Sequence, residues 1–179
     1  MMKELVKLLI DEKKTISTME SCTGGGVANA ITDIEGASEI LKYSAVTYSN
    51  DYKIKMGVSS DVIDQYSVYS IQCAEEMSRN ISEFADSDYG VGITGKLNRV
   101  DVNNPFGEDN VVFVSIYEKA TDKYYNGVVE ATLGSRSENK QLVINEVVGM
   151  MNRILDLQND NDTQFVESPS TYSKVNKNI

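Results

Sequence analysis

Residues Thr15-Ile-Ser-Thr-Met-Glu-Ser-Cys-Thr-Gly-Gly-Gly-Val-Ala-Asn-Ala-Ile31 join three sequence patterns in one short stretch. Thr15–Glu20 is typical of a short strand, Ser21–Gly26 of a glycine-rich turn and Val27–Ile31 of a helix. A strand that turns at once into a helix is characteristic of domains in which helices cover a sheet. The stretch therefore predicts an α/β fold.

The rest of the chain extends this pattern. Helices are predicted over Lys3–Glu12, Asp51–Met56, Asp61–Tyr66, from Ser70 onward and over Glu138–Leu157. Further strands are predicted over Ala45–Tyr48, Tyr89–Ile93, Val111–Ile116 and Tyr125–Ala131, the last two forming a hairpin. We therefore expect a mostly parallel, mixed sheet of five to six strands with helices on both faces.

Length and composition favour one globular domain. The chain has 179 residues, and we expect residues 1–158 to form the domain and the polar residues 159–179 to form a disordered tail. The net charge of −10 disfavours nucleic-acid binding, and no apolar run is long enough to span a membrane. Two cysteines and no recognisable secretion signal predict a cytoplasmic protein.

The absence of histidine restricts the possible chemistry. The sequence has 0 histidines, which excludes Ser-His and Cys-His nucleophile pairs and histidine-ligated metal sites. A general base must then be a lysine, an acidic residue, a tyrosine or a chain terminus.

Polar residues follow three of the predicted strands. Ser21 follows the first, Ser49-Asn50 with Lys53 follows the second, and Thr94-Gly95 ends the third. Ligands of open α/β sheets bind at the carboxyl ends of strands. If the three strands are parallel neighbours, the residues that follow them lie close together at that end of the sheet. Ser21 is then a candidate nucleophile and Lys53 its candidate base. The alternatives are that Ser21 or Thr23 caps a helix and that Lys53 is a solvated surface lysine.

Arg136 is a further candidate. It stands at the start of the last predicted helix, where the helix dipole disfavours a cation, and its guanidinium can hold a phosphate through two hydrogen bonds. The alternative is an ordinary surface arginine. Cys22, in the turn, is either a reactive thiol or a small buried apolar residue.

Taken in order, several motifs resemble the CinA C-terminal domain, or nicotinamide-nucleotide amidohydrolase, family. The resemblance extends from about Leu5 to Leu155. The two most specific motifs are Glu20-Ser-Cys-Thr-Gly-Gly25 and Thr32-Asp-Ile-Glu-Gly-Ala-Ser38, and the looser ones are Val46-Thr-Tyr-Ser-Asn50 with Lys53, Met56-Gly-Val58, Val68-Tyr-Ser70, Ile93-Thr-Gly95, Pro105-Phe-Gly107 and Gly134-Ser-Arg136.

The resemblance implies a three-layer α/β/α sandwich that hydrolyses the carboxamide of nicotinamide mononucleotide. It implies Ser21 as nucleophile, Lys53 as general base and Tyr48 beside it, with no metal or organic cofactor and a homodimeric assembly. The substrate-binding residues expected from the motifs and the strand ends are Thr23, Gly24, Gly25, Asn50, Thr94, Gly95, Lys96 and Arg136.

One segment departs from the family pattern. Where members have Ile-Ala-Gly-Pro and further glycines after Thr-Gly, this chain has Lys96-Leu-Asn-Arg-Val-Asp-Val-Asn-Asn104. Lys96 and Arg99 are candidates to bind phosphate there. The departure leaves two alternatives open, a non-catalytic nucleotide-binding or interaction protein, and an amidase for another small carboxamide.

Overall fold

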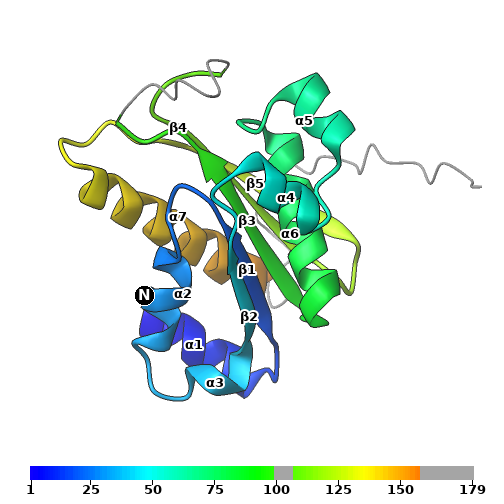
Figure 1. The fold of residues 1–179 in the computed structure, drawn as a ribbon. Helices are drawn as coiled ribbons and strands as arrows, with labels where there is room; N and C mark the ends of the chain where they lie inside the picture. Colours follow the sequence, from blue (N-terminus) through cyan, green and yellow to red (C-terminus); the bar gives the residue numbers. More distant parts are fainter. Residues whose placement is uncertain (99–106, 158–179) are drawn as a thin grey trace, which may run out of the picture.

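A computed structural model describes residues 1–98 and 107–157 and shows a five-stranded sheet between two layers of helices (Figure 1). The elements are α1 (Met2–Asp11), β1 (Ile16–Glu20), α2 (Gly26–Thr32), α3 (Ala37–Ile40), β2 (Leu41–Val46), α4 (Asn50–Lys55), α5 (Ser60–Tyr66), α6 (Ile71–Ala85), β3 (Tyr89–Gly95), β4 (Val111–Glu118), β5 (Lys123–Glu130) and α7 (Arg136–Leu157). The predicted three-layer α/β/α architecture is confirmed.

The strand order is β2-β1-β3-β4-β5. Strand β1 pairs in parallel with both β2 and β3. The β4–β5 pairing is antiparallel, as the hairpin prediction required, and β4 also pairs antiparallel with β3. The carboxyl ends of β2, β1 and β3 therefore lie side by side at one edge of the sheet.

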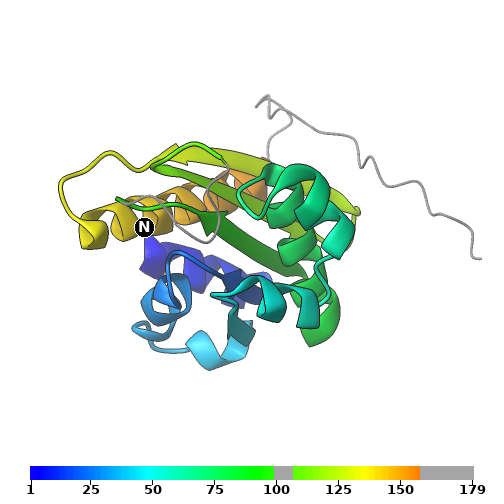
Figure 2. The same ribbon diagram turned by 45° about the horizontal axis from the view of Figure 1, so that its top comes forward.

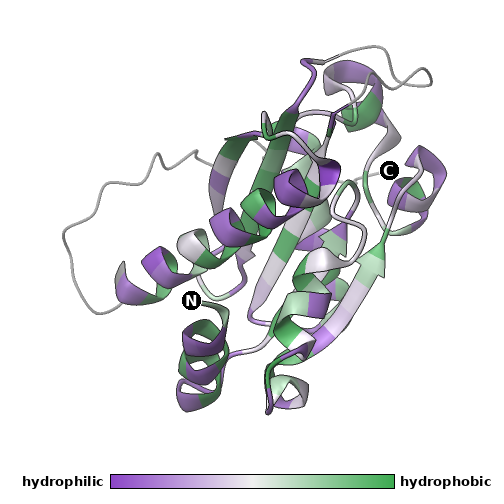
Figure 3. Cartoon of the chain, turned by 90° about the vertical axis from the view of Figure 1, so that its left-hand side faces the viewer, coloured by the Kyte–Doolittle hydropathy of each residue, from purple (hydrophilic) through white to green (hydrophobic). Residues whose placement is uncertain are grey.

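Two apolar cores hold the layers together. The larger core joins α1, α2 and α7 to one face of the sheet through residues such as Leu9, Val27 and Val147, and Figure 2 shows these helices together on that side. The smaller core joins α6 to the other face through Met19, Met77 and Ile81. Figure 3 shows hydrophobic segments along the central strands and hydrophilic ones along the outer sides of the helices.

Two glycines of β3 bring α6 against the sheet. A β-carbon on Gly90 would lie 1.9 Å from the carbonyl oxygen of Ser78, and one on Gly92 would lie 2.2 Å from that of Ala74. Both distances are far below any allowed contact, so the strand needs glycine at these positions.

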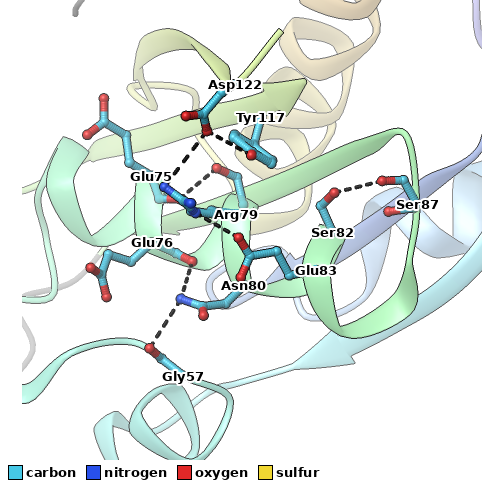
Figure 4. Close-up of polar contacts among 11 residues, drawn as sticks. Gly57, Glu75, Glu76, Arg79, Asn80, Ser82, Glu83, Ser87, Tyr117 and Asp122 are labelled. Carbon is cyan, nitrogen blue, oxygen red and sulfur yellow. Dashed lines mark hydrogen bonds and ion pairs between the residues drawn. The ribbon is translucent and has the colours of Figure 1, made fainter. Parts of the chain in front are cut away.

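Polar contacts fasten the outer side of α6 (Figure 4). Arg79 pairs with Glu83 at 2.8 Å and lies 3.8 Å from Asp122, which accepts a hydrogen bond from the Tyr117 hydroxyl. Asn80 donates to the carbonyl oxygen of Gly57 at 3.1 Å. These contacts link α6 to the β4–β5 hairpin and to the segment after α4.

Two local predictions differ from the structure. The second strand was predicted over Ala45–Tyr48, but β2 begins at Leu41 and ends at Val46. The residues of β2 are exposed or half-buried because β2 is an edge strand of the sheet. The first half of β2 therefore lacks the apolar pattern from which a strand is predicted. The single turn α3 was not predicted, because four residues are too few to show helical spacing.

Among the described helices, none is both long enough and apolar enough to cross a bilayer. The predicted tail, residues 159–179, and Arg99 lie outside the described residues.

Candidate active site

Ser21 lies immediately beyond the carboxyl end of β1, between the ends of β2 and β3. Its backbone N–H donates to the carbonyl oxygen of Ile93 at 3.0 Å, so the chain still follows β3 at this point. The turn then reverses through Gly24 and Gly25, whose φ angles are +63° and +88°. Such angles are strained for residues with a side chain, which explains the glycine-rich sequence. The Ser21 side chain is therefore held on a fixed turn.

Lys53 reaches Ser21 from the neighbouring strand connection. It lies on α4, whose start is capped by the Ser49 hydroxyl accepting from the N–H of Tyr52 at 3.4 Å. Lys53 is only 2% exposed. Its Nζ donates to Ser21 Oγ at 3.0 Å and to the Thr47 carbonyl oxygen at 2.7 Å. The structure thus brings together the two groups predicted to meet, while their catalytic roles remain predictions.

The Glu20 side chain stabilises the turn and the start of α2. Its buried carboxylate accepts hydrogen bonds from the Thr23 hydroxyl at 2.6 Å and from the backbone N–H groups of Val27 and Ala28 at 3.1 and 3.0 Å. A carboxylate at a helix start is favourable because it satisfies unpaired amides. The start of α2 is consequently occupied by Glu20, and Thr23, a predicted substrate contact, is buried against it.

The backbone N–H groups of the turn differ in whether they have an acceptor. The N–H of Gly24 donates to the Ser21 carbonyl oxygen and that of Gly26 to the Thr23 carbonyl oxygen. Within residues 1–98 and 107–157, the backbone N–H groups of Thr23 and Gly25 donate no hydrogen bond. They are the candidate donors to an oxyanion formed next to Ser21.

Arg136 approaches the site from the first turn of α7. Its guanidinium donates to the Leu97 carbonyl oxygen and, at 3.1 Å, to the Tyr48 hydroxyl. Tyr48 is 64% exposed, so this pair stands on the open rim of the site. The two predicted residues are brought together, although 88 residues separate them in the chain.

The third strand end is more enclosed than expected. Thr94 is fully buried and its hydroxyl donates to the Val68 carbonyl oxygen at 2.7 Å. A β-carbon on Gly95 would lie 2.5 Å from the Val111 carbonyl oxygen, so Gly95 is required by close packing. The structure gives both residues a packing role, and their contact with substrate stays a prediction.

Lys96 is also held within the protein. Its Nζ donates to the Gly107 carbonyl oxygen at 3.2 Å, lies 3.5 Å from a carboxylate oxygen of Asp109 and stands 5.1 Å from the centre of the Tyr69 ring. Asn50, the remaining predicted contact, is the first residue of α4.

The Cys22 side chain is buried behind the turn. Burial raises the pKa of its thiol to about 12, although the nearby charges of Arg136 and Lys53 act in the opposite direction. A thiol with this pKa stays protonated at neutral pH and is a poor nucleophile. Of the two alternatives for Cys22, the structure therefore favours a small buried residue over a reactive thiol.

Three residues of the site had no role assigned from the sequence. Glu20 and Thr47 contribute through contacts that only the folded chain shows. Lys140, one helical turn after Arg136 on α7, has its Nζ 3.4 Å from the position of a β-carbon built on Gly24. Its spacing of four residues from Arg136 was a signal in the sequence, because such residues share one face of a helix.

Comparison with known proteins identifies the family. The model of the CinA C-terminal domain matches residues 1–155. A CinA-like protein of Endomicrobium trichonymphae is 33% identical over 150 residues, covering 83% of this chain and 34% of that protein. The chain spans between 22% and 34% of the length of such curated relatives.

Solved structures show the same fold. A CinA superfamily protein from Klebsiella pneumoniae matches with a TM-score of 0.79 and 19% identity, covering 87% of this chain and 95% of that one. A CinA superfamily protein from Escherichia coli matches with a TM-score of 0.76 and 24% identity, covering 86% and 90%.

Proposed function

Because this chain belongs to the CinA C-terminal domain family, we propose that it is a serine amidohydrolase that converts nicotinamide mononucleotide to nicotinate mononucleotide and ammonia. The observation that carries the proposal is the 3.0 Å contact between Lys53 Nζ and Ser21 Oγ at the carboxyl ends of parallel strands. A serine hydroxyl is a weak nucleophile until a neighbouring base removes its proton.

Lys53 is suited to be that base. Burial away from water disfavours the charged form of a lysine, and Lys53 is almost completely buried. The Thr47 carbonyl oxygen holds one N–H of the amine. A neutral amine held in this way can direct its lone pair at the Ser21 hydroxyl. The hydroxyl then donates to Lys53 Nζ, instead of accepting from it, without movement of either atom.

The reaction then proceeds through an acyl-enzyme. Lys53 accepts the hydroxyl proton as Ser21 Oγ attacks the carboxamide carbon, and the carbonyl oxygen becomes an oxyanion. The amides of Thr23 and Gly25 stabilise this charge, and one such donor contributes about 3 kcal/mol in known enzymes. As the C–N bond breaks, Lys53 returns its proton to the leaving nitrogen, which departs as ammonia.

Water completes the cycle. Lys53, neutral again, removes a proton from water, whose oxygen attacks the nicotinoyl ester of Ser21. The C–Oγ bond breaks, the proton returns to Ser21, and nicotinate mononucleotide is released. Each step uses only side chains, backbone amides and water, so the proposal needs no metal or organic cofactor.

Two of the other predicted residues are assigned to substrate. Tyr48 and Arg136 form the exposed rim, where the ribose phosphate of a pyridine nucleotide reaches the site. Thr94, Gly95 and Lys96 are buried and support the site by packing. A cytoplasmic location and a homodimeric state remain predictions from the sequence and the resemblance.

Ammonia release tests the proposal and its two alternatives. The full chain is assayed with nicotinamide mononucleotide, the corresponding dinucleotide and free nicotinamide. We expect turnover of the mononucleotide. Release of ammonia only from a carboxamide other than the mononucleotide would identify a different amidase, and binding without ammonia release would identify a non-catalytic protein.

The nucleophile is tested by Ser21→Ala. Turnover should fall by about a thousandfold or more, as in other serine hydrolases that lose their nucleophile. Ser78→Ala is the matched control, because it removes a buried hydroxyl on α6, bonded to the Glu75 carbonyl oxygen, away from the site. Full activity of Ser21→Ala would refute the mechanism.

A further inference from the structure

The cations on the first two turns of α7 have no acidic partner in the described structure. Arg136 donates to a carbonyl oxygen and a phenol. Lys140 has no hydrogen bond or ion pair within residues 1–98 and 107–157. Glu138, between them in sequence, is engaged by the N–H and hydroxyl of Ser135. Two uncompensated cations near a helix start are unusual in a chain of net charge −10, since the helix dipole disfavours them there.

Both cations lie near the turn that carries Ser21. Lys140 Nζ lies 3.4 Å from where a β-carbon on the exposed Gly24 would stand. Arg136 is close enough to Cys22 for its charge to act on that thiol. Arg136 and Lys140 are four residues apart on one face of α7, so an anion beside Gly24 can contact both.

The start of α2 is not available for the same anion. The N–H groups of Val27 and Ala28 already donate to the Glu20 carboxylate, and that carboxylate would repel a second negative group. An anionic part of a substrate bound at Ser21 is therefore directed away from α2 and toward α7.

We infer that Lys140 and Arg136 form a phosphate subsite at the rim of the Ser21–Lys53 site, with Lys140 as the residue that selects phosphorylated over unphosphorylated substrates. This inference rests on the proposed function for the identity of the substrate. Lys140 supplies a compact mobile charge opposite Gly24, and Arg136 a planar group that can hold two phosphate oxygens. The absence of a β-carbon at Gly24 lets the phosphate approach the turn.

The test compares nicotinamide mononucleotide with nicotinamide riboside, which carries the same carboxamide without the phosphate. In Lys140→Gln the KM for the mononucleotide should rise about tenfold or more, because a charge-assisted hydrogen bond is lost, while kcat stays near its original value. The kinetic constants for the riboside should not change. Equal effects on both compounds, or an effect on neither, would overturn the inference.

Lys119→Gln is the matched control. Lys119 is an exposed lysine paired with Asp86. Its backbone N–H donates to the carbonyl oxygen of Asp88, just before β3. This places it at the opposite end of the sheet from Ser21. Its substitution should leave the preference for the mononucleotide unchanged.

A binding measurement separates this inference from the proposed function. The Ser21→Ala protein, with and without Lys140→Gln, is titrated with each compound by calorimetry. Lys140-dependent binding of the mononucleotide supports the subsite even if the original chain releases no ammonia, in which case only the proposed function fails. Turnover of the mononucleotide with no dependence on Lys140 in kinetics or binding removes the subsite and leaves the proposed function in place.

Discussion

The Nζ of Lys53 lies 3.0 Å from the Oγ of Ser21, although 32 residues separate them in the chain. The parallel pairing of β1 with β2 brings the two strand ends together, and α4 then directs the lysine back over the sheet edge. A buried amine against a hydroxyl is costly to maintain for stability alone, since burial of an amine is unfavourable. The burial of this pair therefore supports the proposed role of Lys53 as a base.

Replacing Lys53 by methionine should abolish turnover without unfolding the protein. Loss of a general base typically costs about a hundredfold to ten-thousandfold in rate. Methionine fills a similar volume and removes a buried polar group, so the midpoint of thermal unfolding should stay the same or rise. Ammonia release and thermal unfolding monitored by circular dichroism check both expectations.

Lys55→Met is the control for this experiment. Lys55 lies on the same helix but is exposed, with its amine 4.5 Å from the centre of the Tyr52 ring. It should retain its activity. Retained turnover in Lys53→Met would show that another group takes the serine proton.

Glu20→Ala should destabilise the fold. It would leave the Thr23 hydroxyl and the amides of Val27 and Ala28 without their acceptor. Each unsatisfied buried donor costs about 1–3 kcal/mol, so the free energy of unfolding should drop by several kcal/mol. Urea unfolding measures this drop. Glu35→Ala, on an exposed residue, should change little, and a comparable loss there would contradict the role given to Glu20.

Gly90→Ala and Gly92→Ala should separate α6 from the sheet. Their β-carbons would overlap the backbone of α6, and such overpacking costs about 3 kcal/mol or more where backbone atoms must move. The urea midpoint should fall sharply in both variants. Gly134→Ala serves as control, because the nearest atom to its β-carbon would be a Glu138 carboxylate oxygen at 3.8 Å. Unchanged stability of Gly90→Ala would mean that α6 packs less closely than described.

The two thiols should resist alkylation in the folded protein. Burial raises the pKa of Cys22 and of Cys73 to about 12, so both remain protonated at pH 8. Iodoacetamide should modify neither in native protein and both in urea, as mass spectrometry would show. Rapid modification of native Cys22 would contradict its burial.

The same thiols make stability depend on alkaline pH. Their pKa values are higher in the folded than in the unfolded chain, so above about pH 8.5 the unfolded chain binds fewer protons. Their stabilising contribution is complete below that pH and decreases up to about pH 12. Replacing both cysteines by alanine should flatten this part of the stability curve measured by urea unfolding.

The local sequence was sufficient for most of the secondary structure. The change from strand pattern to glycines to helix pattern at Thr15–Ile31 predicted β1, the turn and α2, because each depends on neighbouring residues. The alternation of strands with helices predicted a parallel sheet, and the polar turn after β4 predicted the hairpin. Edge strand β2 was placed less well, since an exposed strand needs no apolar pattern.

The site was predictable only in part. The motifs and the strand ends pointed to Ser21, Lys53 and Arg136, because functional groups of such sheets follow the carboxyl ends of strands. They did not show that Thr94 and Lys96 are enclosed by other segments, or that Glu20 occupies the helix start. Those contacts join residues distant in the chain.

By itself the sequence determined the α/β class, the exclusion of histidine chemistry and the candidates for nucleophile and base, since these follow from residue type and local pattern. Only the tertiary structure decided that Lys53 meets Ser21, and that Lys140 faces Gly24. The physical reason is that side-chain distances depend on strand order and helix packing, which are set by burial across the whole domain.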